Sequence, residues 1–136
     1  MHSDTTKASP MFSSIPAFSG FSVDDLDDAE RFYGETLGLE TSRDAMGFLR
    51  ITLGSGAVVM AYGKQSHTPA SFTILNFPVD DVDAAVDRLN SRGVETKIYS
   101  DDKITTDAKG IMRGRGPDIA WFTDPAGNVL AVFSAE

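Results

Sequence analysis

The sequence predicts an α+β domain built from two tandem copies of one βαβββ module. The segment at residues 21–29 (FSVDDLDDA) reappears at residues 77–85 (FPVDDVDAA). Each copy is followed by a helical stretch and then by a similar motif, LGLET at 37–41 and RGVET at 92–96. A repeat with a period of roughly 55 residues indicates that one module cannot bury its apolar face alone and needs its copy. A ligand would then bind where the two copies face each other.

The first module is predicted to contain a strand, a helix and three further strands. These elements cover residues 17–23, 25–37, 40–44, 47–53 and 57–62. Asp25 is a suitable N-cap for the helix, and Gly38 is a suitable stop. The GSG sequence at 54–56 predicts the turn of a hairpin in which Arg50 lies opposite Met60.

The second module is predicted to repeat this plan. Its elements are a strand over 71–79, a helix over 82–92, a strand over 95–99, and a final hairpin with strands over 119–123 and 129–134. The DPAGN sequence at 124–128 supplies the residues that the hairpin turn requires, and this hairpin is predicted to pair Trp121 with Ala131. The repeat further predicts that Phe21, Val23 and Asp25 occupy the same local environments as Phe77, Val79 and Asp81.

Length and composition predict one compact domain. The chain has 136 residues, 41% of them hydrophobic, which is enough apolar material for a core. We expect residues 1–14 to form a disordered tail and residues 15–136 to form a single domain, with module one over 15–66 and module two over 70–136. Cysteine is absent, which excludes disulfides, thiolate metal ligands and cysteine nucleophiles.

The charge of the chain bears on its partners and its location. A net charge of −8 argues against nucleic acid as a partner. The longest apolar run, at 57–62, is too short to cross a membrane, and the first residues lack the apolar core of a signal peptide. We therefore expect a cytoplasmic protein.

The acidic residues cluster at the two predicted helix starts, where they either cap the helices or attract a cationic ligand.

A βαβββ module used twice, with these motifs in this order, resembles the vicinal-oxygen-chelate superfamily of glyoxalases, bleomycin-resistance proteins, fosfomycin-resistance enzymes and extradiol dioxygenases. The resemblance covers residues 16–134 and depends most on VDDLDDA at 23–29, LGL at 37–39 and DPAGN at 124–128. It implies two modules whose mixed sheet curls into a partly open barrel around a cleft, commonly within a homodimer.

The resemblance also locates the positions that hold a metal ion in the metalloenzymes of the superfamily. Carried onto this sequence, they fall at Phe18, Met60, Ile74 and Ala131. None of these side chains offers an oxygen or nitrogen ligand. The two histidines, His2 and His67, lie in the tail and in the linker between the modules, and His67 is predicted to be a solvated loop residue. We therefore expect no metal and no other cofactor.

Strand alternation predicts which side chains line the cleft. The predicted ligand-binding set is mostly apolar and aromatic and comprises Phe18, Phe48, Arg50, Met60, Tyr62, Ile74, Asn76, Trp121 and Phe133. Apolar walls with few polar groups are typical of a small-molecule pocket, although the same side chains could fill a closed core. No nucleophile–base pair is predicted here, because we expect neither Ser22 nor Thr123 to have a histidine that could activate it.

The sequence leaves the roles of Arg50 and Trp121 open. Arg50 on an inward face could bind a carboxylate ligand, form a salt bridge with Glu30 or Glu35, or extend its charged end outward. Trp121 beside Tyr62 could stack on a planar or cationic ligand, or serve only in packing.

The long polar segment at 100–118 has no counterpart in the first module. It is rich in glycine, and such segments are often lids or binding loops. The sequence predicts a lid in which Ile111 and Met112 cover a ligand while Arg113 and Arg115 approach its anionic group. The alternative is a solvated loop without a role.

Together these features predict a metal-free protein that binds a small molecule in an apolar aromatic cleft, for sequestration or resistance. The alternative is a lyase, isomerase or dioxygenase-like enzyme of the same superfamily, so the sequence leaves open whether the protein is an enzyme.

Overall fold

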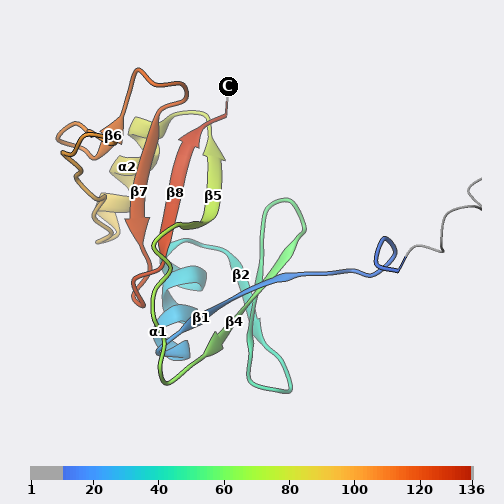
Figure 1. Cartoon of the computed structure of the whole chain (residues 1–136). Helices are drawn as coiled ribbons and strands as arrows, with labels where there is room; N and C mark the ends of the chain where they lie inside the picture. The colour runs from blue at the N-terminus through green and yellow to red at the C-terminus, as the bar shows by residue number, and fades with distance from the viewer. Residues whose placement is uncertain (1–10, 136) are drawn as a thin grey trace, which may run out of the picture.

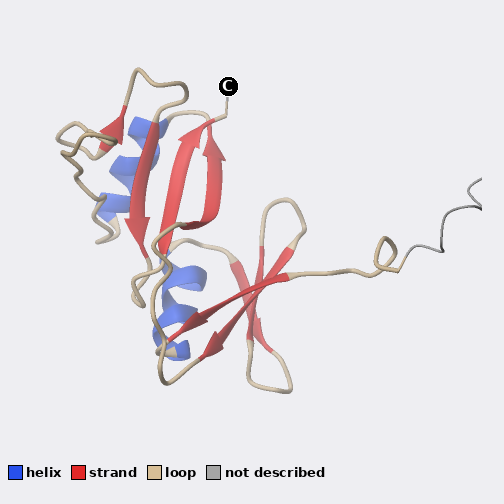
Figure 2. Cartoon of the chain, viewed as in Figure 1, coloured by secondary structure: helices blue, strands red, loops and turns tan. Residues whose placement is uncertain are grey.

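The computed structural model describes residues 11–135 and confirms an α+β fold of two βαβββ modules. Each module forms a four-stranded mixed sheet that stays open (Figures 1 and 2). Module one contains β1 (Ser19–Val23), α1 (Leu26–Glu30), the π-helix η1 (Arg31–Thr36), β2 (Glu40–Arg43), β3 (Leu49–Thr52) and β4 (Val58–Gly63). The strand order is β1-β4-β3-β2, with β1 parallel to β4 and the other neighbours antiparallel.

Module two has the same sheet topology. It contains β5 (Thr73–Val79), α2 (Val82–Ser91), β6 (Ile111–Met112), β7 (Ile119–Thr123) and β8 (Val129–Ser134). The strand order is β5-β8-β7-β6, again with one parallel pair, β5 with β8. In Figure 1 the two sheets lie end to end, and α1 lies near the lower ends of β7 and β8. The edge strands β1 and β5 are the first strands of the two modules.

The register of the strands confirms the internal repeat. Phe21 lies opposite Ala61 and Val23 opposite Gly63 in module one. Their counterparts lie opposite the equivalent residues of β8, with Phe77 opposite Val132 and Val79 opposite Ser134.

Both helices begin with the predicted aspartate cap. The Asp25 side chain accepts a hydrogen bond from the Asp28 amide at 3.1 Å, and Asp81 accepts one from Ala84 at the same distance. The two caps have nearly identical extended backbone angles, φ −138° and −139°. These carboxylates stabilise the helix N-termini by satisfying amides that lack helical partners.

The strand predicted over 95–99 is wrong, because no ladder forms there. The Lys97 amide donates to the Trp121 carbonyl at 2.8 Å, and the chain then leaves the sheet. It returns at β6, where Ile111 lies opposite Ala120. The edge strand beside β7 is therefore interrupted by the excursion at 98–110.

Gly110 closes the base of this excursion. Its φ is +84°, and a Cβ at this position would lie 2.6 Å from Thr96 Oγ1 and 2.8 Å from the Lys97 carbonyl oxygen. Thr96 Oγ1 donates to the Lys109 carbonyl at 2.6 Å, which holds the two sides of the excursion together. Only glycine fits this backbone conformation and this close approach.

One core extends through both modules. It contains the helix-facing residues of each sheet together with Phe32 and Tyr33 of η1. Residues 11–18 are exposed and lead away from the sheets (Figure 1). The rest of the predicted tail, residues 1–10, lies outside the described residues. Within the described part of the chain, none of the helices has the length and apolar character that a membrane span requires.

Candidate functional site

A pocket of about 720 Å³ lies where the two modules meet. The edge strands β1 and β5 form its two main walls, and it is lined by residues 17–22, Leu53, 57–59, Thr68, Ala70, 72–75 and Asn128. Most of these side chains are small or apolar. The location agrees with the expectation from the repeat that a ligand would bind between the copies. Phe18 and Ile74 of the predicted set are in this lining.

The bulge in β5 changes the predicted orientation of its first residues. Thr73 lies opposite Val129 and Leu75 lies opposite Leu130, so Ile74 has no partner on β8. Simple alternation therefore fails before Leu75, since a bulge adds one residue to one strand. Ile74 lines the pocket and also packs against the core.

A second group of predicted residues continues from the pocket across the sheet of module one. Gly20, which lines the pocket, lies opposite Met60, and Met60 lies opposite Arg50 as predicted. Two strand spacings place Arg50 roughly 10 Å from Gly20 along this row. Phe48 and Tyr62 flank the row, with ring centroids 6.3 Å apart.

Arg50 is the exposed cation of this surface. Within residues 11–135 it makes no ion pair, and Glu30 pairs instead with Arg43 at 3.1 Å. Tyr62 is 39% exposed, whereas Met60 is 7% exposed. The surface thus combines an aromatic pair, a buried thioether and an accessible guanidinium group.

The remaining predicted residues lie on the sheet of module two. Asn76 and Trp121 both lie opposite Ala131, and Phe133 follows on the same strand face. Trp121 packs edge-on against Tyr99 at 5.5 Å, so its aromatic partner is Tyr99 and not Tyr62. The structure therefore distributes the predicted set over the pocket and two sheet faces.

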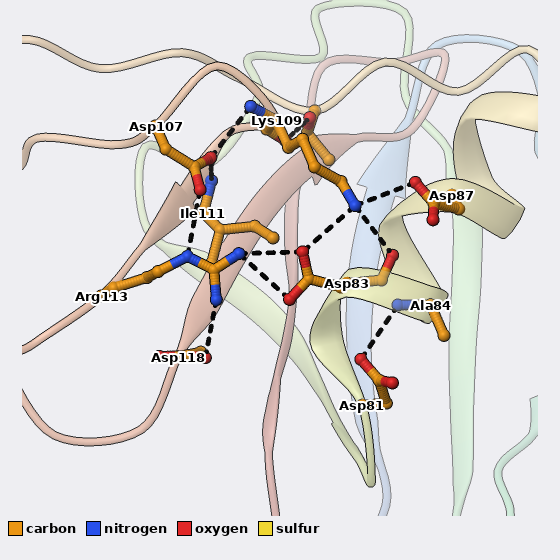
Figure 3. A network of polar contacts seen from close by, with 10 residues as sticks. Asp81, Asp83, Ala84, Asp87, Asp107, Lys109, Ile111, Arg113 and Asp118 are labelled. Atoms are coloured by element: carbon orange, nitrogen blue, oxygen red, sulfur yellow. Dashed lines mark hydrogen bonds and ion pairs between the residues drawn. The ribbon is translucent and has the colours of Figure 1, made fainter.

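Two residues of the predicted lid, Ile111 and Arg113, lie on the helix side of module two. Ile111 is 1% exposed and belongs to the core. Met112 of β6 pairs with Ile119 of β7, and Arg115 is exposed. Arg113 donates to three carboxylates, those of Asp83, Asp107 and Asp118 (Figure 3). A lid movement would have to break this network and the β6–β7 pairing.

The four positions that the resemblance assigns to metal ligands carry side chains without an oxygen or nitrogen ligand. Met60, Ile74 and Ala131 lie in β4, β5 and β8, and Phe18 directly precedes β1. Within the described residues, no group of three or more histidine and acidic side chains is close enough to hold a metal ion. The donor set of this site therefore does not fit a metal centre.

The prediction that Ser22 has no histidine beside it is wrong. Ser22 Oγ lies 2.7 Å from His67 Nδ1, and His67 Nε2 lies 3.0 Å from the Ala126 carbonyl oxygen. His67 is half-buried, so it is not the solvated loop residue that was predicted. These residues are 45 and 59 positions apart, and no sequence pattern signals their approach.

A buried polar network surrounds this pair and joins the modules. Asn128 donates to the Ser22 carbonyl at 3.0 Å and to Asp124 at 3.1 Å. Tyr33 of module one donates to Asp124 at 2.7 Å. Burial raises the pKa of Tyr33, and the nearby charge of Asp124 raises it further. Tyr33 therefore remains a neutral donor at any physiological pH.

The fold is an open pair of βαβββ modules with a mostly apolar pocket between them. The family model of the Glyoxalase/Bleomycin resistance protein/Dioxygenase superfamily matches residues 16–132. The chain belongs to this superfamily. No curated protein matches the sequence.

Solved structures with the same fold include an antibiotic-binding protein, TnmS3, from Streptomyces sp. CB03234. It is 26% identical, with a TM-score of 0.61, and the match covers 90% of this chain and 98% of that one. A glyoxalase family protein from Enterococcus faecalis is 21% identical, with a TM-score of 0.62 and the same coverages. The fosfomycin resistance protein FosX from Listeria monocytogenes is 15% identical, with a TM-score of 0.66 and coverages of 88% and 92%. The last two show the fold alone.

Proposed function

We propose that the protein binds a small aromatic molecule without the help of a metal ion, as a sequestration or resistance protein. The observation that carries the proposal is the pocket of about 720 Å³ between the modules; Gly20 lines it, and Met60 and Arg50 follow Gly20 in the same row of the sheet. Apolar walls with one accessible charged group suit an aromatic ligand that carries a carboxylate. TnmS3, at 26% identity, is described as an antibiotic-binding protein, which supports this kind of function.

The same observations make a metal-dependent dioxygenase or glyoxalase activity the less favoured function. Such an enzyme would need oxygen or nitrogen ligands on strands that here carry Met60, Ile74 and Ala131. We keep the cytoplasm, predicted from the sequence, as the proposed location.

We further propose that the working form is a homodimer. The segment at 11–18 carries four large apolar side chains, and each is at least 56% exposed: Met11, Phe12, Ile15 and Phe18. Phe72, at the other wall of the pocket, is 69% exposed. Exposed apolar side chains gathered beside an edge strand mark an interaction surface. A second copy would cover this surface and close the mouth of the pocket.

Thermal unfolding with 1-naphthoate as the probe tests the binding proposal, and bleomycin extends the screen to a cationic antibiotic. At a hundredfold excess over Kd, 1-naphthoate should raise Tm by about 5–10 °C. Arg50→Gln should reduce the shift for 1-naphthoate and leave the shift for the neutral naphthalene-1-carboxamide unchanged. Arg31→Gln, on the exposed face of the helix, is the matched control.

Gly20→Val tests the pocket itself. A Cβ at Gly20 would lie 3.4 Å from the Met60 carbonyl oxygen, so the strand accepts a side chain that fills part of the pocket. This variant should fold and lose the Tm shift with both naphthalene compounds. A full shift in Gly20→Val, or no response of the wild type to any aromatic probe, would contradict the proposal.

A further inference from the structure

The Ser22–His67 pair has the geometry of a nucleophile and its base. Ser22 Oγ and His67 Nδ1 are 2.7 Å apart, and the imidazole is held from its other side by the Ala126 carbonyl at 3.0 Å. A hydroxyl within hydrogen-bond reach of a base, with the base oriented by a third group, is the arrangement that activates serine nucleophiles.

The hydrogen bonds fix the direction of proton transfer. A carbonyl oxygen only accepts, so His67 Nε2 must carry the proton that is shared with Ala126. In neutral imidazole the other nitrogen, Nδ1, is then the acceptor. Ser22 Oγ–H therefore donates to Nδ1, which is the direction that general-base activation of the hydroxyl requires.

The surroundings hold the pair in place. Asn128 donates to the Ser22 carbonyl and accepts from the Ala70 amide at 3.3 Å, so it ties β1 to the linker that carries His67. Asn128 is 2% exposed and Asp124 is 3% exposed. Buried and mutually bonded groups of this kind restrict the positions of the side chains that they support.

Ser22 also faces a place where a substrate could bind. It lines the pocket between the modules, on the same strand as Phe18 and Gly20 and near Ile74 of the opposite wall. Most of the residues that line the pocket are apolar or small. An apolar acyl group could occupy it with its carbonyl carbon next to Ser22 Oγ.

We propose that Ser22 is an acyl-accepting nucleophile, with His67 as its general base, and that the substrate is an ester or similarly activated acyl compound with an apolar acyl group. Ser22 Oγ forms a bond to the acyl carbon while its proton moves to His67 Nδ1. The bond from the acyl carbon to the leaving alcohol breaks, and the alcohol takes the proton from Nδ1. Water then gives a proton to His67 Nδ1 as its oxygen bonds to the acyl carbon, the bond from that carbon to Ser22 Oγ breaks, and Oγ takes the proton from Nδ1, which releases the carboxylic acid and restores Ser22.

This inference uses the pocket of the proposed function but makes a separate claim about it. A binding protein needs only the walls of the pocket, whereas acyl transfer needs the Ser22 hydroxyl and the His67 imidazole.

A fluorophosphonate probe tests the nucleophile directly, and p-nitrophenyl butyrate tests turnover. Wild-type protein should gain one phosphonyl group per chain, located at Ser22 by peptide mass spectrometry, and should hydrolyse the ester. Ser22→Ala should abolish both reactions, and His67→Gln should slow both by about a hundredfold. Ser91→Ala is the matched control, because Ser91 is an exposed serine at the end of α2 that does not line the pocket.

A second variant keeps the test decisive if Ser22→Ala folds poorly. The chain has no cysteine, so Ser22→Cys introduces the sole thiol. Iodoacetamide should alkylate it at least about tenfold faster than in Ser22→Cys/His67→Gln, because an imidazole partner promotes the thiolate.

No labelling of the wild type, labelling that persists in Ser22→Ala, or equal alkylation of the two cysteine variants would overturn the proposal. Parallel measurements on the wild type separate the two claims. If the wild type binds 1-naphthoate but is not labelled and does not hydrolyse the ester, only the catalytic proposal fails. If the wild type is labelled at Ser22 without any aromatic binding, only the proposed function fails.

Discussion

At the scale of single residues, the contact between Tyr33 and Asp124 is the main polar link between the modules. Tyr33 is fully buried in module one, and Asp124 is 3% exposed in the last turn of module two. Asp124 also accepts hydrogen bonds from the Ala126 and Asn128 amides and from the Asn128 side chain. A buried carboxylate with this many donors organises the turn and receives Tyr33 as the donor from the other module.

Tyr33→Phe should lower the free energy of unfolding by about 1.5–3 kcal/mol, because it removes a hydrogen bond to a charged and buried acceptor. Urea unfolding at neutral pH measures the change. Tyr99→Phe is the control, since the Tyr99 hydroxyl makes no hydrogen bond within residues 11–135, and it should change stability little. Equal stability of Tyr33→Phe and wild type would show that the contact does not link the modules in solution.

The sequence predicts the cross-strand partner of a residue well where only the geometry of a nearby turn matters. The turn at 54–56 correctly predicted Arg50 opposite Met60, and the final turn correctly predicted Trp121 opposite Ala131. Ser22 and His67 could not be paired in this way, because their contact depends on how a linker folds back over the first strand. These residues are far apart in the sequence, and no pattern of a few neighbouring residues predicts such a contact.

At the scale of elements, the network around Arg113 joins the end of the excursion at 98–110, and the residues just after β6, to helix α2. Arg113 contacts Asp83 at 2.8 and 3.0 Å, and Lys109 contacts Asp83 at 3.1 Å and Asp87 at 3.0 Å (Figure 3). The hydrogen bond from Arg113, followed by that from Lys109, lowers the pKa of Asp83. Each pair is exposed to solvent, so the network acts by fixing geometry more than by adding stability.

Asp83→Asn should weaken the attachment of the excursion to α2. Amide exchange at 111–113, measured by mass spectrometry at neutral pH, should rise relative to wild type, while Asp80→Asn, outside the network, should leave it unchanged. A carboxylate with a lowered folded pKa stabilises the fold above its unfolded pKa, and this contribution is lost as pH falls through the folded value. After correction for intrinsic rates, wild type should therefore approach the Asp83→Asn pattern below about pH 4.

Unchanged protection in Asp83→Asn at neutral pH would contradict this role of the network. The same experiment bears on the predicted lid, since a lid over the cleft would gain protection at 111–115 when 1-naphthoate is added. The network predicts that protection is already present without the ligand.

The limits of prediction at this scale have a physical cause. Residues 95–99 were predicted as a strand, yet they form no ladder, because the chain leaves the sheet after the Lys97 amide donates to Trp121 and β7 is paired farther along the chain by β6. A pattern indicates which residues can pair but not where an insertion interrupts the pairing. The helix after β1 was predicted, but its change at Arg31 to π-type winding was not.

At the scale of the whole molecule, the repeat predicted two similar modules, and their end-to-end placement comes from contacts that the repeat does not encode. The open edges of both sheets face the pocket, and an exposed apolar segment lies beside them. An acidic chain with a net charge of −8 is protected from general aggregation, so exposed apolar groups at one place indicate a specific contact.

The last prediction is that two copies associate through this segment. Sedimentation equilibrium should give twice the 14.6 kDa of one chain for the wild type. The double variant Phe12→Ser/Ile15→Ser should weaken the dimer at least about a hundredfold, because each copy would lose the burial of two large apolar side chains. Met46→Ser is the control, since Met46 is 78% exposed in a turn of module one, away from the segment. If the wild type is a monomer at the highest concentration reached, or if the double variant dimerises as tightly as the control, the segment is not the interface. Because Phe18 of the segment also lines the pocket, loss of the dimer should reduce the Tm shift with 1-naphthoate in parallel.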